Sequence, residues 1–117
     1  MNRSPDFNIL PLYLAKQIIE ENFGEKICRP SLVRRLAMND TDFSSRFKKL
    51  FGTTAKQYQL QLRVEHAKKL LSLTNEPIRE IAERLGYGHA ANFTVLFKKR
   101  VGIPPVAWRI INKEENI

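Results

Sequence analysis

A ten-residue pattern occurs twice in this chain, 50 residues apart. It reads Phe-Ser-Ser-Arg-Phe-Lys-Lys-Leu-Phe-Gly over residues 43–52 and Phe-Thr-Val-Leu-Phe-Lys-Lys-Arg-Val-Gly over residues 93–102. In each copy two phenylalanines are four residues apart, a spacing that puts both side chains on one face of a helix. The closing glycine is typical of a helix end. The repeat therefore predicts two similar helices, each with a buried aromatic face.

A short helix and a tight turn are expected before each copy. Residues 36–38 (Leu-Ala-Met) correspond to residues 85–87 (Leu-Gly-Tyr) at an offset of 49, so the second copy has one extra residue in its turn. A short helix, a turn at a small residue and a longer helix form a helix-turn-helix unit, whose second helix enters the DNA major groove. A helical repeat used for protein contact, or a duplication within a helical bundle, is the alternative interpretation.

The rest of the chain is also helical in pattern. Apolar residues recur at three- and four-residue steps, and no strand pattern of period two persists over four residues. The expected fold is all-α, with two helix-turn-helix subdomains joined by a long linking helix and about seven helices in total. The helices are expected over residues 11–23, 29–36, 40–51, 55–72, 77–85 and 90–101, with a last turn that carries Trp108. The expected organisation is a lead at 1–10, a first helix-turn-helix subdomain at 11–53, the linking helix at 54–73, a second subdomain at 74–110 and a tail at 111–117.

The same spacing predicts which side chains face inward. On the short helices and recognition helices these are Leu32, Val33, Leu36, Phe43, Phe47, Leu50, Ile78, Ile81, Ala82, Leu85, Phe93 and Phe97. On the linking helix they are Tyr58, Leu62, Leu70 and Leu71. Asn39 is expected to be the N-cap of the helix that follows it, with Asp42 three residues later as in a capping box.

The chain is basic, and the excess charge lies in its middle. It contains 20 Lys and Arg against 12 Asp and Glu, a formal net charge of +8. From Lys26 to Arg109 there are 17 basic and 6 acidic residues, a net charge of +11. Such a surface suits a polyanion, most often nucleic acid, although a solvated basic surface that aids solubility is the simpler alternative.

Several other classes of protein are disfavoured. The only cysteine, Cys28, excludes an intramolecular disulfide, and His66 and His89 do not show metal-ligand spacing. The longest apolar run, residues 9–15, is far shorter than the roughly 20 residues of a membrane helix. There is no phosphate-binding glycine loop and no catalytic Ser/His/Asp or Cys/His set. The chain is therefore expected to be cytoplasmic and not an enzyme, with no cofactor and no metal.

From about Leu14 to Arg109 the chain resembles the DNA-binding domain of the AraC/XylS transcription regulators. The resemblance rests on Phe43, Phe47, Lys48, Lys49, Gly52, Tyr58, Arg63, residues 75–78 (Asn-Glu-Pro-Ile), residues 81–87 (Ile-Ala-Glu-Arg-Leu-Gly-Tyr), Asn92, Phe93, Phe97, Lys98, Lys99, Gly102, Pro105, Trp108 and Arg109. It implies a sequence-specific regulator of transcription that binds double-stranded DNA. Two recognition helices, about 40–51 and 90–101, would enter successive major-groove segments of a promoter.

The resemblance also bears on partners and on chain organisation. It implies promoter or operator DNA as the partner in the bacterial nucleoid, with RNA polymerase as a second partner. Most members carry a separate effector-binding or dimerising domain, which would lie N-terminal to this stretch. A few members consist of the DNA-binding domain alone and bind as monomers. A start at Met1, about ten residues before the first helix, fits either arrangement.

Transferred position by position, the resemblance assigns two kinds of contact residue. The base-facing residues are Thr41, Ser44, Ser45, Ala90, Ala91, Thr94 and Val95. The phosphate-facing residues are Lys48, Lys49, Asn92, Lys98, Lys99 and Arg100. The second recognition helix departs from the family, in which several of its base-facing positions are commonly polar. Alanine and valine cannot hydrogen-bond a base, so weak direct readout and a larger role for DNA shape are expected there.

Other residues near these positions have more than one interpretation. Asp40 and Asp42 repel phosphate but are able to accept a hydrogen bond from cytosine N4, and helix capping is the favoured role of Asp42. Arg63 is expected to be structural, paired with helix-end carbonyls or with neighbours on the side of Glu65 and not with DNA, and Trp108 is expected to close the core of the second subdomain. Arg34 and its neighbour Arg35 either contact the DNA backbone or are solvated.

The alternative to a DNA regulator is a helical adaptor that binds an acidic protein or RNA. An adaptor would show little preference for one duplex sequence, whereas a regulator favours its site by about 10³-fold or more. A catalytic function has the least support, because DNA repair proteins with a related helical module would need several more cysteines.

Overall fold

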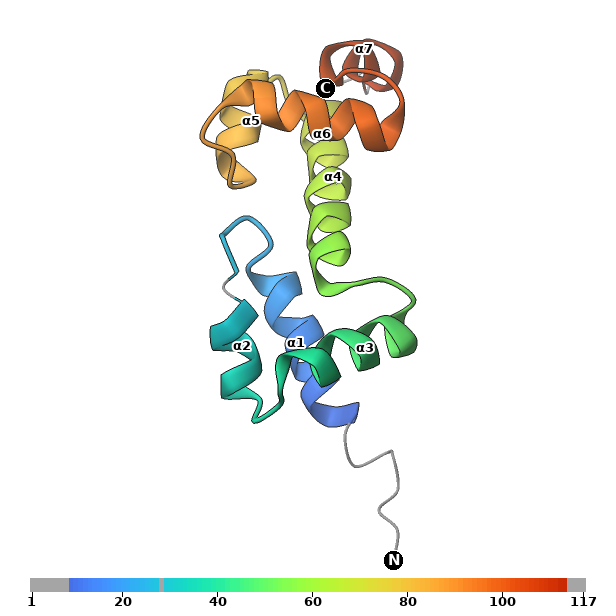
Figure 1. Ribbon diagram of the computed structural model, residues 1–117. Coiled ribbons are helices and arrows are strands. Elements are labelled where there is room, and N and C mark those ends of the chain that lie inside the picture. Colours follow the sequence, from blue (N-terminus) through green and yellow to red (C-terminus); the bar gives the residue numbers. More distant parts are fainter. Residues whose placement is uncertain (1–8, 28, 114–117) are drawn as a thin grey trace, which may run out of the picture. The chain divides into compact units, whose positions relative to one another are not determined.

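The computed structural model describes residues 9–27 and 29–113 of the chain, and within them it is all-helical. The helices are α1 (Ile9–Glu21), α2 (Arg29–Arg35), α3 (Asp40–Phe51), α4 (Ala55–Leu73), α5 (Ile78–Arg84), α6 (Ala90–Val101) and α7 (Pro105–Asn112) (Figure 1). Each helix expected from the sequence is present, and α3 and α6 have the expected bounds. The all-α prediction with about seven helices is therefore confirmed. None of the helices in these two stretches is long and apolar enough to cross a membrane.

The chain forms two compact units that divide between Leu60 and Gln61, within α4. The first unit contains α1, α2, α3 and the beginning of α4. The second contains the rest of α4 with α5, α6 and α7, and Figure 1 shows α6 lying across the end of α4 beside α5.

The core of the first unit is built on α1, α2 and α3. Its buried side chains are Leu12, Ala15, Ile19, Leu32, Val33, Phe43 and Phe47. On α3 the aromatic row continues to Phe51, whose ring centroid lies 4.6 Å from that of Phe47. Because Phe43, Phe47 and Phe51 already form the inward row at four-residue steps, Leu50 lies at its edge. The expectation that Leu50 is buried is wrong, since 38% of the residue is exposed.

The core of the second unit repeats this arrangement with α5 and α6. Its fully buried side chains include Leu71, Ile81, Leu85, Phe93 and Phe97. The half-buried Trp108 of α7 packs edge-on against Phe97, with ring centroids 6.2 Å apart. Trp108 therefore closes this core as the sequence predicted.

The inward face of α4 differs from the expected one. Leu71 is buried, but Tyr58, Leu62 and Leu70 are only half-buried. The remaining buried residues of the helix are Gln59, Arg63, Val64 and Ala67. Gln59 is inward because its amide donates hydrogen bonds to two loop carbonyls, those of Phe23 at 3.1 Å and Glu25 at 2.8 Å. The spacing of apolar residues cannot predict such a position, since Gln59 is buried through the hydrogen bonds of its polar amide group.

Two arginines have structural roles in the second unit. Arg63 is 8% exposed, and its guanidinium lies 4.8 Å from the centroid of the Tyr87 ring, a cation–π contact. Arg109 donates hydrogen bonds to two backbone carbonyls, Leu71 O at 3.1 Å and Glu76 O at 2.7 Å. These bonds hold α7 against the C-terminal end of α4.

The two recognition-type helices begin and end as their sequences predict. The Asn39 side chain accepts a hydrogen bond from the Asp42 backbone N–H at 2.7 Å, which caps α3. Gly52 and Gly102 end α3 and α6 with φ of 80° and 103°, a left-handed conformation that glycine adopts without strain.

A small polar cluster joins α1 to α4 in the first unit. Lys16 Nζ lies 2.8 Å from Glu20 Oε2, and the Tyr58 hydroxyl donates to the same carboxylate oxygen. The hydrogen bond from Lys16 lowers the pKa of Glu20, and burial raises the pKa of Tyr58. The cluster therefore favours an ionised Glu20 and a neutral Tyr58.

Candidate nucleic-acid interface

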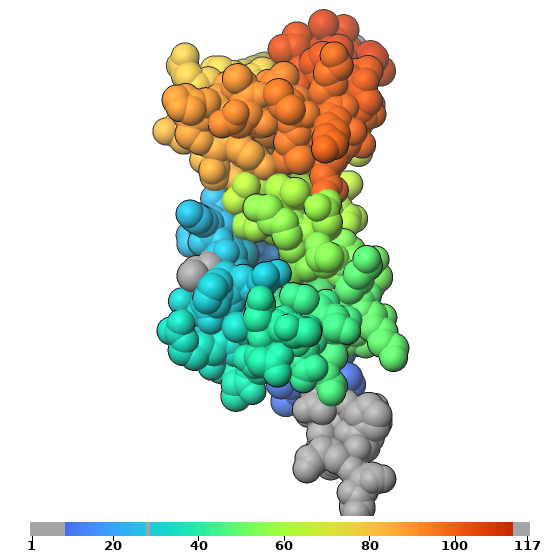
Figure 2. All heavy atoms as spheres, viewed as in Figure 1, coloured from blue at the N-terminus to red at the C-terminus, as the bar shows by residue number. Residues whose placement is uncertain are grey.

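The exposed faces of α3 and α6 have the same pattern. From 41 to 51 and from 91 to 101, each residue of α3 and its counterpart in α6 fall in the same class of burial, position by position. The two phenylalanines of each helix are buried and the two lysines that follow are exposed. The repeat in the sequence therefore corresponds to a repeat in the structure, because α3 and α6 leave side chains at equivalent positions exposed. Figure 2 shows α3 and α6 at the surface of their own units.

The residues of α3 and α6 that are expected to face bases differ in how exposed they are. The exposed ones are Thr41, Ser45, Ala91 and Val95. The half-buried ones are Ser44, Ala90 and Thr94. On α6 one of these exposed side chains is a large apolar one, Val95, which is 67% exposed. Contact of these residues with bases remains a prediction.

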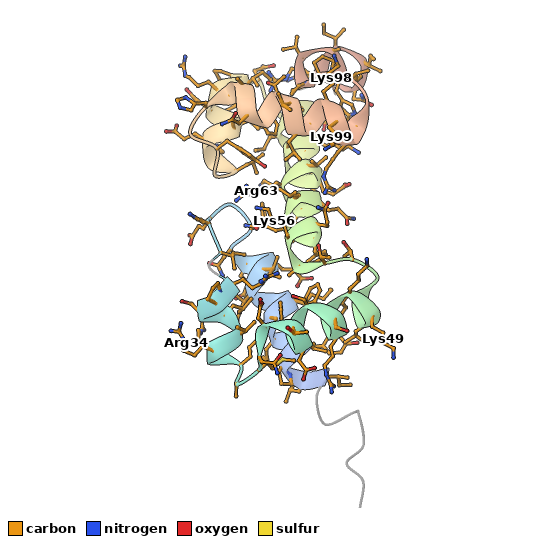
Figure 3. All side chains as sticks on the ribbon, in the orientation of Figure 1. Arg34, Lys49, Lys56, Arg63, Lys98 and Lys99 are labelled. Carbon is orange, nitrogen blue, oxygen red and sulfur yellow. The ribbon has the colours of Figure 1, made fainter. Side chains whose placement is uncertain are left out.

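The expected phosphate-facing residues are all exposed. They are Lys48, Lys49, Asn92, Lys98, Lys99 and Arg100. All but Asn92 lie in the last turn of their helix or directly beside it, where a cation also interacts favourably with the helix dipole. Figure 3 shows Lys49 extending from α3, and Lys98 and Lys99 on α6. Arg34 extends away from α2 in the same view, and its role stays open between a backbone contact and solvation.

The first unit contains a contact that the sequence reasoning missed. Arg29, at the start of α2, reaches the first turn of α3. Its Nε lies 2.9 Å from Asp40 Oδ1 and its Nη2 lies 3.1 Å from Asp40 Oδ2. Its Nη1 is 3.4 Å from Ser44 Oγ, so one guanidinium spans two residues of the outward face. Arg29 and Asp40 lie on different helices with a turn between them, so their spacing along the chain does not predict the contact, and only the helix crossing brings them together.

The second unit has no equivalent of this contact in its sequence. At the repeat offsets, Ile78 stands where Arg29 stands and Ala90 stands where Asp40 stands. Neither side chain can form an ion pair. The two helix-turn-helix units thus share a scaffold and differ in chemistry at the start of the second helix.

A groove lined by apolar and basic residues lies beside this contact within the first unit. It has a volume of about 570 Å³, and Lys26, Arg29, Lys56 and Ser44 are among the residues that line it. Lys56 is labelled at the start of α4 in Figure 3. Thr54 caps this end of α4 by accepting a hydrogen bond from the Gln57 N–H at 3.1 Å. The groove therefore brings Lys26 and Lys56 near the Arg29 contact, among apolar side chains that include Leu32 and Phe43.

Comparison with known proteins identifies the family. A helix-turn-helix domain model of the AraC type matches residues 32–110, which is most of the chain. The chain belongs to the AraC/XylS family. Its resemblance to that family, noted in the sequence, is thereby confirmed.

Curated relatives of the AraC/XylS type cover most of this chain. It is 37% identical over 102 residues to the bifunctional transcriptional activator/DNA repair enzyme AdaA of Bacillus subtilis, a match covering 87% of this chain and 48% of that protein. It is 34% identical over 85 residues to the transcriptional activator RhaR of an Enterobacter species, covering 73% of this chain and 28% of that one. The chain thus spans less than half the length of these two relatives.

Solved AraC/XylS structures have the same fold. The C-terminal domain of the response regulator AraT from Geobacillus stearothermophilus matches with a TM-score of 0.85 and 28% identity, covering 99% of this chain and 93% of that one. The DNA-binding domain of AdpA, solved with a target DNA, matches with a TM-score of 0.79 and 27% identity, covering 86% and 91% of the two chains. The double helix-turn-helix fold expected from the sequence is confirmed.

Proposed function

We propose that this protein is a transcription regulator that binds specific sequences of double-stranded DNA, with α3 and α6 as its two recognition helices. The observation that carries the proposal is the matching exposure of α3 and α6, each with its phenylalanines inward and its lysines outward. A family whose members are named as transcriptional regulators, and a structural neighbour solved with DNA, support it. In this proposal each helix enters one of two successive major-groove segments of a promoter.

The first recognition helix would read bases through hydroxyl groups. Thr41 and Ser45 are exposed on α3, and their hydroxyls can donate to or accept from base edges. Lys48 and Lys49, one turn further along, would bind phosphate oxygens and fix the register of the helix on the duplex. This half of the protein would therefore supply most of the direct sequence readout.

The second recognition helix would act mainly through apolar contact and through the DNA backbone. Ala91 and Val95 are exposed on α6 and can touch a thymine methyl group, but they cannot hydrogen-bond a base. Asn92, Lys98, Lys99 and Arg100 would hold phosphates, so sequence preference in this half would depend more on DNA shape and bending.

The proposal assigns the chain no catalytic step. Its single cysteine and the lack of a nucleophile–base set in its sequence support a binding function over the repair activity named for AdaA. We place the protein in the cytoplasm, at promoter DNA, with RNA polymerase as a further partner. An effector or dimerisation domain N-terminal to this stretch belongs to the same proposal, since the relatives are longer than this chain.

The decisive experiment is in vitro selection from random duplex DNA by this chain, at near-physiological salt. We expect two short elements about one helical turn apart to be enriched. Affinity for the selected site should exceed that for unrelated DNA by about 10³-fold or more. Binding that falls with salt but selects no sequence, both in this chain and in a dimeric fusion of it, would refute the proposal and favour the adaptor interpretation over a missing dimerisation domain.

Variants separate base reading from backbone binding. Thr94→Ala and Ala91→Arg on α6 should change the selected sequence if that helix reads bases, and an unchanged sequence would show that it does not. Lys69→Gln is a control for a change elsewhere on the surface, because Lys69 is an exposed lysine of α4, outside both recognition helices. It should leave the selected sequence unchanged.

A further inference from the structure

The geometry points to Arg29 as a guanine-reading side chain of the first helix-turn-helix, with Asp40 as the residue that positions it. This inference rests on the proposed function and deepens it, because it names a base and the residue that reads it. Arg29 lies on α2, outside the recognition helix to which base reading is usually assigned.

The first step is the position of the Arg29 guanidinium, which lies at the start of α3. Asp40 and Ser44 lie one turn apart at the start of α3, and the same guanidinium contacts both of them. The N-terminal residues of a recognition helix are those that reach base edges in the major groove. Arg29 therefore holds its charged group at the part of α3 that a bound duplex would approach. Its side chain remains 54% exposed there.

The second step is the count of donors that remain. A guanidinium has five N–H groups. Asp40 accepts from Nε and Nη2, at 2.9 and 3.1 Å, and Ser44 is a long contact of Nη1, at 3.4 Å. One N–H on Nη1 and one on Nη2 remain for a ligand. Guanine offers a matching pair of acceptors, O6 and N7, to a bidentate arginine in the major groove.

The third step concerns why the ligand is a base edge and not a phosphate. Asp40 neutralises the charge of Arg29, so the pair as a whole is attracted only weakly to the DNA backbone. Arg29 still has free N–H donors, and its two hydrogen bonds to the Asp40 carboxylate fix the direction in which these donors point. Both carboxylate oxygens are used in this way, which leaves Asp40 less able to accept from cytosine, the role considered for it from the sequence.

The test uses four variants of the whole chain in binding assays against a selected site and its single-base changes. Arg29→Ala should abolish the preference for guanine at one position of the site and weaken binding to that site by roughly 5- to 150-fold. Affinity for unrelated DNA should fall only slightly, through repulsion by the Asp40 carboxylate that is left unpaired, and the slope of log affinity against log salt should barely change, because no phosphate contact is lost. Arg29→Lys keeps the charge without the planar fork, so it should lose the same preference.

The Asp40 variants test the positioning role with an effect of opposite sign. Asp40→Ala frees a cation, so binding to unrelated DNA should tighten and the slope of log affinity against log salt should steepen by about 0.9. The guanine preference should weaken at the same time, because the guanidinium has lost its orientation. Asp40→Asn keeps one acceptor oxygen and should restore part of that preference.

Four outcomes would overturn the inference. Arg29→Ala could weaken all sequences equally and lower the salt slope by about 0.9, which would make Arg29 a phosphate contact. Asp40→Ala could sharpen the guanine preference, which would show that Asp40 masks Arg29 and does not position it. The selected site could lack a guanine whose preference depends on Arg29. The wild-type chain could select no sequence at all, alone or as a dimeric fusion, an outcome that would also refute the proposed function, whereas the first three leave that function intact.

Arg34→Ala is the matched control for these variants. It removes a cation from the same helix, and its side chain extends away from α2 (Figure 3). We expect it to leave the base preference at every position unchanged. The Arg29–Asp40 pair is exposed, and such pairs contribute little to stability, so all of these variants should fold.

Discussion

The turn of the first helix-turn-helix contains a strained residue whose replacement should stabilise the protein. Within the described residues, Ala37 is the only residue other than glycine with a positive φ, at 57°. The left-handed conformation costs an alanine about 1–2 kcal/mol. In the second turn the corresponding residue is Gly86, at φ 94°, where glycine carries no such cost.

The perturbation is Ala37→Gly, and its size follows from two opposing terms. Glycine removes the backbone cost of about 1–2 kcal/mol. It also gives the unfolded chain more freedom, which destabilises the folded state by about 0.4–1 kcal/mol. The methyl group of Ala37 is lost with little effect on packing, because the residue is exposed. The free energy of unfolding should therefore rise by about 1 kcal/mol, a Tm increase of roughly 4–8 °C for a unit of this size.

Thermal and urea unfolding of three variants would test this reasoning. Gly86→Ala creates the strain that Ala37→Gly removes, and the same two terms with their signs reversed should lower stability by about 1 kcal/mol. Gly88→Ala is the control, because Gly88 has no positive φ and a Cβ built there meets nothing within 4 Å. It should be neutral or slightly stabilising. A loss of stability in Ala37→Gly, or equal effects of the two alanine variants, would refute the argument.

Three further predictions concern charge, packing and pH. Replacing Lys98 and Lys99 by glutamine should lower the slope of log affinity against log salt by about 1.8, and an unchanged slope in a salt titration would show that they do not bind phosphates. Phe97→Ala should destabilise the second unit by about 3–5 kcal/mol, since Phe97 is fully buried, and fluorescence of the single tryptophan would follow this unfolding. The lowered pKa of Glu20 means that its hydrogen bond with Lys16 stabilises the fold above the ordinary pKa of 4.5 and ceases to do so as pH falls through the folded value. Glu20→Gln should therefore be less stable than wild type at about pH 7, the difference should shrink as pH falls through the folded pKa of Glu20, and a constant difference in pH-dependent urea unfolding would contradict this.

The sequence predicted the helices closely because each has local signals for its ends. Asn39 caps α3, Gly52 and Gly102 end α3 and α6, and Pro105 begins α7. The spacing of the two phenylalanines predicted correctly which face of each recognition-type helix is buried, because a single row of apolar side chains packs against the core of its unit.

Prediction from the sequence was weaker where burial depends on distant polar groups. Gln59 is buried because it binds carbonyls of the loop after α1, more than thirty residues earlier in the chain. Arg109 was matched to the family, but its hydrogen bonds to α4 and to the residue before Pro77 were not expected. Such contacts leave no periodic signal, since neither partner needs a particular spacing from the other.

By itself, the sequence determined the all-α fold, the duplicated unit and the side chains that each recognition-type helix exposes, because helical period and end signals are local properties. The tertiary structure alone decided what happens at the start of α3. There the crossing of α2 and α3 brings Arg29 onto Asp40 and Ser44, residues that nothing in their spacing connects. An ion pair between helices depends on the angle and distance at which the helices pack, and these are set by the core beneath them.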